Sequence, residues 1–293
     1  MSFAPRPNFD WQLRTRTLAL GPRTVVMGIL NVTPDSFSDG GHFYSPEHET
    51  DRALAHALAM LDDGAAILDI GGESTRPSAT PLPPADEQER ILPVIAAILK
   101  ARPTAILSVD TYHAATARLA VEAGAEIVND VSGHLWDSAM SATCAALGCG
   151  AILMHARGRP HEWPTLPPLA HNEVVPLVLR ELQARVEAAT AAGIPHAKIA
   201  IDPGFGFGKI RDENYPLLAH LDRLQALGLP IVSGTSRKGF LGHTLGNPTA
   251  DRLHATTASN VAAVLAGAHI LRVHDVRPGA EAAAIADRIL EAG

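Results

Sequence analysis

The chain has 293 residues, of which 46% are hydrophobic and 19% charged, and its formal net charge is −7. This composition is typical of a globular protein with a large core, and the mild acidity and 4% aromatic content argue against nucleic-acid or membrane-surface binding. No apolar run approaches the ~20 residues that span a bilayer. The polar N-terminus also lacks a signal-peptide core, so we expect a cytoplasmic protein.

Cys144 and Cys149 are the only two cysteines. They are too few for a disulfide framework and lack metal-site partners, so we expect buried reduced thiols.

The order of predicted elements is regular along the chain. Residues 1–23 are expected to be an N-terminal leader, with brief strands over 11–15 and 18–20 that pair as a hairpin. Short runs rich in Val, Ile and Leu then predict eight strands, at 24–30, 65–70, 104–109, 126–129, 150–154, 198–201, 230–233 and 269–273. Amphipathic segments predict eight helices between and after them, at 46–63, 84–100, 113–123, 137–147, 171–192, 212–227, 249–266 and 279–291.

Eight strand–helix units in about 270 residues match the count and size of a single-domain (β/α)8 barrel. The strand runs are apolar on both faces, as strands of a covered parallel sheet are. A doubly wound open sheet is the alternative, but it rarely has eight units of such even length. No composition shift marks a boundary, so we expect one barrel domain over residues 24–293.

Polar residues follow every predicted strand, at the end where a barrel of this kind has its active site. They are Asn31, Asp69, Asp110, Asn129, Asp130, His155, Asp202, the Arg237–Lys238 pair, and Arg272 with His274. Any one of them has an ordinary interpretation as a helix cap, and we assign Asp69 and Asp130 to that class. The recurrence at all eight strand ends predicts a binding site.

The residue types at these ends indicate a ligand with two parts. Asp110, Asn129 and Asp202 offer acceptors for the N–H edge of a flat heterocycle, because a carboxylate accepts two such bonds at once. Arg76, Arg272 and His274 are potential cations for phosphate, and the loops after strands seven and eight often bind phosphate in this fold. Asn31 has an oxygen suited to Mg²⁺, which binds through few protein ligands together with phosphate oxygens and water. A nitrogen heterocycle carrying a diphosphate fits this description.

The glycine-rich segment 204–209 looks at first like a phosphate loop. A P-loop requires Gly where Pro203 stands and Ser or Thr where Ile210 stands, so the motif does not apply. The histidines nowhere form His-Glu-x-x-His, which argues against a tightly held zinc.

Five motifs together resemble dihydropteroate synthases, and the likeness extends in order from about residue 20 to 290. The motifs are Asn31-Val-Thr-Pro-Asp-Ser-Phe-Ser-Asp-Gly-Gly41, Asp69-Ile-Gly-Gly-Glu-Ser-Thr-Arg-Pro77, Asp202-Pro-Gly-Phe-Gly-Phe-Gly-Lys209, Ser236-Arg-Lys238 and Arg272-Val-His-Asp275. The resemblance implies condensation of 6-hydroxymethyl-7,8-dihydropterin diphosphate with p-aminobenzoate in folate biosynthesis, giving 7,8-dihydropteroate and diphosphate. It also implies a homodimer, with Mg²⁺ as cofactor.

The family's functional residues transfer to matching positions here. The resemblance assigns the pterin to Asp110, Asn129, Met154, Asp202, Phe205 and Lys238, and the diphosphate to Arg76, Arg272 and His274. It assigns p-aminobenzoate, with which sulfonamides compete in this family, to Phe37, Thr75, Pro77, Phe207 and Ser236. Asn31 is the implied Mg²⁺ ligand, and the implied catalytic residues are Lys238, Arg272, Asp35 and Asp110. Arg237 remains unassigned and is predicted to form a structural salt bridge.

Two alternatives remain. A folate-binding methyltransferase shares the pterin pocket but does not need cations for a diphosphate, and the Ser-Arg-Lys and Arg-Val-His motifs argue against it. A non-catalytic pterin-binding paralogue would show degraded loops after strands one and two, and both motifs are intact. Diphosphate release distinguishes the synthase from both.

Overall fold

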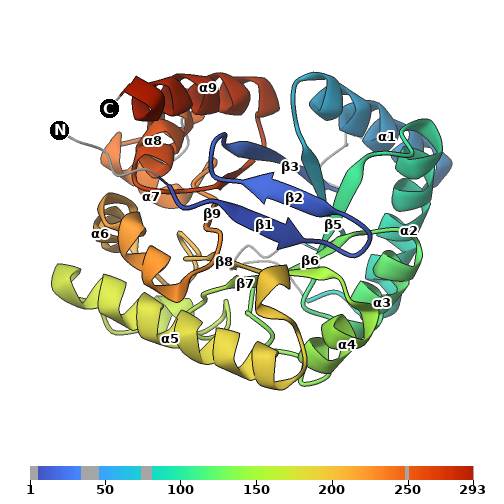
Figure 1. Ribbon diagram of the computed structural model, residues 1–293, viewed down its shortest axis with the longest axis horizontal. Helices are drawn as coiled ribbons and strands as arrows, with labels where there is room; N and C mark the ends of the chain where they lie inside the picture. The colour runs from blue at the N-terminus through green and yellow to red at the C-terminus, as the bar shows by residue number, and fades with distance from the viewer. Residues whose placement is uncertain (1–5, 34–45, 74–80, 248–250, 293) are drawn as a thin grey trace.

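Alternating strands and helices close the chain into a barrel (Figure 1). The computed structural model describes residues 6–33, 46–73, 81–247 and 251–292. Within this part, eight strands form one sheet in the order β8-β7-β6-β5-β4-β3-β10-β9, with parallel pairing throughout. A single parallel bridge between Ile201 and Ile231 joins the two outer strands of that order. The predicted (β/α)8 fold is confirmed. The strands are β3 (Val25–Asn31), β4 (Ile67–Gly71), β5 (Ile106–Asp110), β6 (Ile127–Asp130), β7 (Gly150–Met154), β8 (Ile199–Asp202), β9 (Val232–Ser233) and β10 (Ile270–Val273).

The helices surround the sheet as a ring (Figure 1). They are α1 (Pro46–Asp62), α2 (Pro84–Ala101), α3 (Ala114–Glu122), α4 (Met140–Leu147), α5 (His171–Ala191), α6 (Asn214–Ala219), α7 (Gly239–Thr244), α8 (Leu253–Leu265) and α9 (Val276–Ala292). The single helix predicted over 212–227 is wrong in detail. That segment is α6 between two 3₁₀ segments, because the backbone leaves the helical region at His220 (φ −124°, ψ 33°). The short helix α7 was not predicted.

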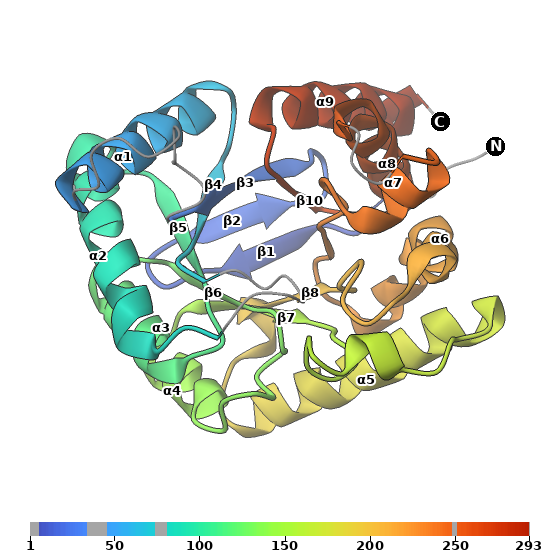
Figure 2. The same ribbon diagram turned by 180° about the vertical axis from the view of Figure 1, so that it is seen from behind.

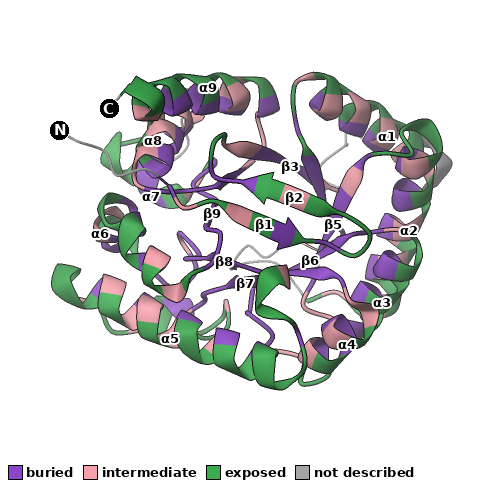
Figure 3. Ribbon diagram, viewed as in Figure 1, coloured by how far each residue is buried: buried purple, intermediate pink, exposed green. Residues whose placement is uncertain are grey.

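Side chains along the strands alternate between the barrel interior and the layer under the helices, as the period of two requires. Leu68, Leu107 and Val128 belong to the outer cluster beneath the helices, whereas Ile67 and Ile127 belong to an inner one. Figure 3 shows the strands mostly buried and the outer helix surfaces exposed. In most strands the first inward residue is apolar and the next inward residue, two positions later, is polar, as with Ile67 and Asp69. The alternation therefore gives the barrel one apolar end and one polar end.

The N-terminal residues form a hairpin that covers the apolar end of the barrel (Figure 1). Strands β1 (Phe9–Gln12) and β2 (Thr17–Leu20) pair antiparallel. Trp11, Leu13 and Leu20 are at most 2% exposed and pack in one cluster with the inward apolar residues of the barrel strands. Trp11 also donates its indole N–H to the Lys198 carbonyl at 2.9 Å. The predicted hairpin is confirmed, although its strands begin earlier than 11 and 18. The boundary after residue 23 stays a prediction.

Buried polar contacts fasten the same end. Arg6 and Asp287 form an ion pair at 2.6 Å, and Asp287 also accepts hydrogen bonds from the Thr24 backbone and hydroxyl. These contacts join the N-terminal segment, the entry to β3 and α9. Among the described residues, no helix has both the length and the apolarity that a membrane crossing requires.

The fully buried His269 is held neutral at this end. Its Nδ1 accepts the Ile231 N–H at 3.2 Å, and its Nε2 lies 3.0 Å from the Pro7 carbonyl, so Nε2 carries the proton. Burial lowers the pKa of His269 to about 4. Below about pH 6.5 the unfolded chain binds a proton at this histidine, whereas the folded chain does not until about pH 4.

We expect the free energy of unfolding to fall as the pH drops from 7 to 5, and His269 alone should account for about 2 kcal/mol of the loss. His269→Gln replaces the ring by a group that accepts and donates without titrating, so its decrease should be smaller by that amount. Urea unfolding of both proteins at the two pH values measures the difference. Parallel losses would show that His269 is not the titrating group.

Candidate active site

The polar end of the barrel brings together side chains from β4, β5, β6, β7, β8 and β10 and from the segments after β8 and β9. This is the end away from the hairpin, seen in Figure 2. The predicted site residues that gather there are Asp110, Asn129, Met154, Asp202, Phe205, Phe207, Ser236, Lys238, Arg272 and His274, together with Asn31 at the end of β3.

Arg272 lies at the centre of an ion-pair network. Its Nε contacts Asp69 Oδ2 at 2.6 Å, and its Nη2 contacts Asp110 Oδ2 at 2.5 Å. Asn129 donates to the same Asp69 oxygen at 2.9 Å. Burial alone would lower the pKa of Arg272, but Asp69 and Asp110 raise it above its ordinary value. The guanidinium is therefore fixed in place and permanently charged.

Asp69 belongs to this network, so its assignment as a helix cap is wrong. Its side chain is fully buried; Arg272 balances its charge, and Asn129 donates a hydrogen bond to it. The second oxygen of Asp69, Oδ1, and the Ser108 hydroxyl beside it in the strand register have no hydrogen-bond partner in the described structure. Buried polar atoms without partners are costly, which makes them natural contacts for a polar ligand.

Asp110 and Asp202, two of the buried acids at this end, have perturbed acidity. Burial raises the pKa of Asp110 to about 7, and Arg272 opposes that rise. Burial also raises the pKa of Asp202, whose Oδ1 accepts the Gly204 N–H at 2.7 Å. A cationic or N–H-rich ligand edge would lower both pKa values by favouring the carboxylates.

Lys238 lies between the acidic groups and an aromatic surface. Its Nζ is 4.0 Å from the centre of the Phe207 ring. Burial and the neighbouring Arg272 lower the pKa of Lys238 to about 8, whereas Asp202 and Asp110 oppose the shift. Phe207 packs edge-on against Trp163 in a small apolar cluster that also contains Met154. The site therefore has charged groups beside an apolar wall, as a flat polar ring requires.

His274 is neutral rather than a cation. Burial, together with Arg272, Arg237 and Lys238, lowers its pKa to about 3. Its Nδ1 lies 3.0 Å from Ser236 Oγ, which also accepts the His274 backbone N–H at 3.1 Å. In the tautomer in which the Ser236 hydroxyl donates to Nδ1, the ring proton lies on Nε2. An anion near Nε2–H would gain a hydrogen bond and raise the pKa of the ring.

The structural salt bridge predicted for Arg237 is confirmed. Arg237 forms an exposed two-point ion pair with Asp275, at 3.0 and 2.5 Å. Asp130 has a structural role but does not cap a helix, because the N-cap of α4 is Ala139. Asp130 accepts hydrogen bonds from the backbone N–H groups of Ser132 and His134, so it orders the turn after β6.

Five predicted site residues lie outside the described residues: Asp35, Phe37, Thr75, Arg76 and Pro77. Glu73, which directly precedes residues 74–80, was not predicted to have a role. Its Oε1 accepts hydrogen bonds from the Tyr112 hydroxyl at 2.7 Å and from the Leu82 N–H at 3.2 Å. Glu73 therefore ties residues on both sides of 74–80 to the start of the loop after β5.

Asn31 ends β3 on the inward side, two residues after Ile29 in the alternation, and it is half-buried. In the described residues, no group of three or more His, Cys, Asp or Glu side chains is arranged to hold a metal ion. A neutral oxygen donor at the polar end suits Mg²⁺, because this ion takes most of its ligands from water and phosphate.

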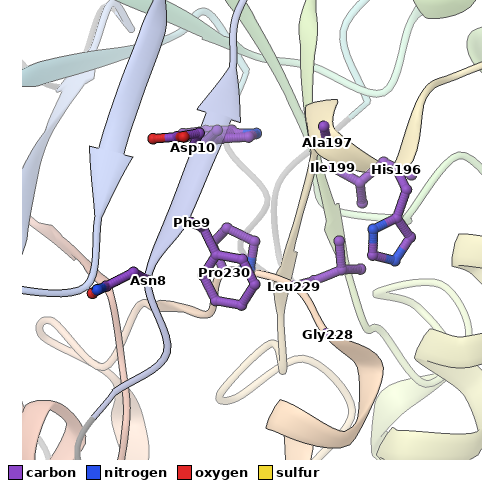
Figure 4. A pocket seen from close by; sticks show the side chains of 10 residues that line it. Asn8, Phe9, Asp10, His196, Ala197, Ile199, Gly228, Leu229 and Pro230 are labelled. Carbon is purple, nitrogen blue, oxygen red and sulfur yellow. The ribbon is translucent and has the colours of Figure 1, made fainter.

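A separate pocket of about 390 Å³ lies at the opposite end of the barrel (Figure 4). The hairpin residues Phe9 and Trp11 and the segment before β8 line it, and its exposed polar residues are Asn8, Asp10 and His196. It contains no buried charge, so we do not regard it as the active site.

Comparison with known proteins agrees with this geometry. Residues 27–274 match the family described as pterin binding enzyme. The dihydropteroate synthase of Bacillus subtilis is 42% identical over 276 residues, covering 94% of this chain and 92% of the relative. A solved structure of Xanthomonas albilineans dihydropteroate synthase with 4-aminobenzoic acid has a TM-score of 0.85 at 40% identity, covering 97% and 98% of the two chains. Another, in complex with 7,8-dihydropteroate, has a TM-score of 0.81 at 38% identity, covering 97% and 98%.

The Arg272 network predicts a large stability loss in Arg272→Met. The substitution leaves the buried Asp69 and Asp110 carboxylates without their cation, which typically costs about 3 kcal/mol or more. Arg237→Met is the matched control, since it removes an exposed ion pair at the same end and should cost about 1 kcal/mol or less. Urea unfolding at pH 7.5 measures both, and equal losses would contradict the central place of Arg272.

Proposed function

The chain belongs to the pterin binding enzyme family, and on that premise we propose that it has dihydropteroate synthase activity. It condenses 6-hydroxymethyl-7,8-dihydropterin diphosphate with p-aminobenzoate, releasing 7,8-dihydropteroate and diphosphate. The observation that carries the proposal is the polar end of the barrel. There, acidic acceptors for a heterocycle adjoin Lys238, Arg272 and the donor His274, beside an aromatic wall.

The pterin ring binds across Asp110, Asn129 and Asp202. These residues are inward neighbours around one arc of the barrel and have acceptors or amide groups that match a pterin edge. Met154 and Phe205 supply apolar contacts, because both are at most 5% exposed next to this arc. Lys238 lies within electrostatic reach of Asp202 and Asp110, so it completes the pterin contacts.

The diphosphate is held by Arg272 and His274, and by Arg76 from the segment that the structure does not describe. The neutral His274 donates Nε2–H rather than supplying a fixed positive charge. Binding of pterin N–H groups to Asp110 competes with its contact to Arg272, which frees guanidinium charge for the phosphate oxygens. Substrate binding therefore readjusts the ion-pair network that Arg272 forms with Asp69 and Asp110.

The reaction breaks the C–O bond between the pterin methylene and the diphosphate. The electron pair leaves with the diphosphate, whose growing charge is stabilised by the guanidinium and the donated hydrogen bonds. The methylene then bears positive charge delocalised into the pterin, which the carboxylates Asp110 and Asp202 favour. The amine of p-aminobenzoate forms the new C–N bond and loses a proton.

The p-aminobenzoate site adjoins Phe207 and Ser236, with Phe37, Thr75 and Pro77 assigned by resemblance. Phe207 presents an aromatic face beside Lys238, and p-aminobenzoate also contains an aromatic ring. Asp35 is assigned a catalytic role on the same basis. We propose Mg²⁺ as the cofactor, with Asn31 as its protein ligand; when bound, the ion neutralises charge on the diphosphate.

An assay of diphosphate release tests the proposal. Release should require both the pterin diphosphate and p-aminobenzoate, and it should fall when EDTA removes Mg²⁺ and return when Mg²⁺ is added. Release with the pterin substrate alone would indicate a hydrolase instead. No release under any condition, with pterin still bound, would favour a non-catalytic pterin-binding protein.

We also propose that the chain is a cytoplasmic homodimer. Ile285 and Ile289 lie one helical turn apart on α9 and are 62% and 39% exposed. Two large apolar side chains on one helix surface are common in an interface between copies. The cytoplasmic assignment agrees with Cys144 and Cys149, which are both free and buried, as in proteins of reducing compartments.

Sedimentation velocity should give twice the chain mass for the native protein at micromolar concentration. The double substitution Ile285→Glu and Ile289→Glu should shift it to the monomer, since like charges would face each other across the interface. A native monomer, or a dimer insensitive to the substitutions, would contradict this arrangement.

A further inference from the structure

Lys209 is a buried lysine that the reaction as proposed does not use. It is 3% exposed and ends the glycine-rich segment that follows β8. Its Nζ lies 2.8 Å from His155 Nδ1, 3.1 Å from the Phe207 carbonyl and 3.3 Å from the His155 carbonyl. Burial lowers the pKa of Lys209 to about 7. In its ammonium form the side chain has three N–H donors, and three acceptors surround it here. Each donor of Lys209 is thus used within the protein, and none is left for a ligand.

The partner His155 has a defined orientation. Its Nδ1 faces Lys209, so it accepts, and its Nε2 lies 3.0 Å from Glu181 Oε2, so it donates. Burial and the charge of Lys209 lower the pKa of His155 to about 3, which keeps the ring neutral in this tautomer. Glu181 in turn lies 3.7 Å from Arg185 on the same helix. The contacts connect helix α5, the end of β7 and the loop after β8.

The segment 203–208 depends on this connection because its backbone is unusual. Gly204, Gly206 and Gly208 all have positive φ angles, of 67°, 80° and 70°. A Cβ on Gly204 would lie 1.9 Å from the His155 carbonyl oxygen, so the loop lies directly against the strand end. Lys209 binds that same carbonyl and the Phe207 carbonyl, and so holds the two segments together.

The held loop follows Asp202 and carries two aromatic side chains, Phe205 and Phe207. Asp202 precedes it and accepts the Gly204 N–H, and its own carbonyl accepts the His155 N–H at 2.9 Å. Phe205 stacks on Phe240, with ring centres 6.2 Å apart. Phe207 lies under the Lys238 ammonium. A shift of the loop would therefore move an acidic contact and both aromatic surfaces at once.

We propose that Lys209 is a positioning residue which, with His155 and Glu181, fixes loop 203–208 in the conformation that binds the pterin. The inference rests on the proposed function, because it assumes that the site takes a pterin. Lys209 does not touch the substrate. It acts through the carbonyl groups that it holds and through the loop residues Phe205 and Phe207.

Lys209→Met tests the proposal, since it keeps the length of the side chain and removes all three donors. Lys198→Met is the matched control. Lys198 also donates its Nζ to two carbonyl groups, of Leu13 at 2.7 Å and Gly148 at 2.8 Å, but at the hairpin end of the barrel. Both variants should lose thermal stability. In isothermal titration with the pterin diphosphate, Lys209→Met should bind at least tenfold more weakly, and Lys198→Met should bind like the native chain.

Steady-state rates add a second readout. Lys209→Met should raise KM for the pterin substrate more than it lowers kcat, whereas loss of folded enzyme would lower the apparent kcat at unchanged KM. Asp202→Asn removes a direct pterin contact, so its effect on KM is the reference for complete loss of that contact. Native affinity in Lys209→Met would overturn the proposal.

Glu181→Ala decides the matter if Lys209→Met does not fold. Glu181 is one-third exposed, and its removal releases the His155 tautomer, so pterin affinity should fall about threefold. Native affinity in this variant would then overturn the proposal. If the native chain itself binds no pterin, both the proposed function and this inference are wrong. Pterin binding by the native chain, unchanged in both variants, removes only the role of Lys209.

Discussion

The buried ion pairs of Arg272 with Asp69 and Asp110 are the interaction on which the functional end of the barrel depends. One guanidinium compensates two carboxylates in a region from which water is largely excluded, and Asn129 shares one of the carboxylate oxygens. Removing either charge type would leave the other buried and unpaired. In the proposed reaction, substrate binding exchanges partners within this network rather than opening it.

The alternation of side chains along the strands explains why such a network is possible in a stable protein. The first inward residue of most strands is apolar and packs on the Trp11 hairpin, while the residue two positions later is polar. The hairpin covers the apolar layer at one end of the barrel. The other end can then carry charges whose burial would destabilise an isolated site.

The Lys209–His155–Glu181 contacts show a second level of organisation. Lys209 donates to the Phe207 carbonyl within loop 203–208 and to His155 outside it, and so holds a glycine-rich segment with three left-handed residues in one conformation. Glycine permits this backbone but does not enforce it. The hydrogen bonds of the buried ammonium supply the constraint that the loop sequence lacks.

Much of this protein followed from the sequence alone. The regular spacing of apolar runs and amphipathic segments predicted the barrel, because burial on both strand faces and helix periodicity are local properties. The polar residues after each strand predicted the site for the same reason. Asp69 was misassigned because its partner Arg272 is 203 positions away, and His155 had no assigned role because Lys209 is 54 positions away. Only the folded chain decided these pairings, and with them that His274 is neutral, since distance and burial determine charge states and neither is a property of one segment.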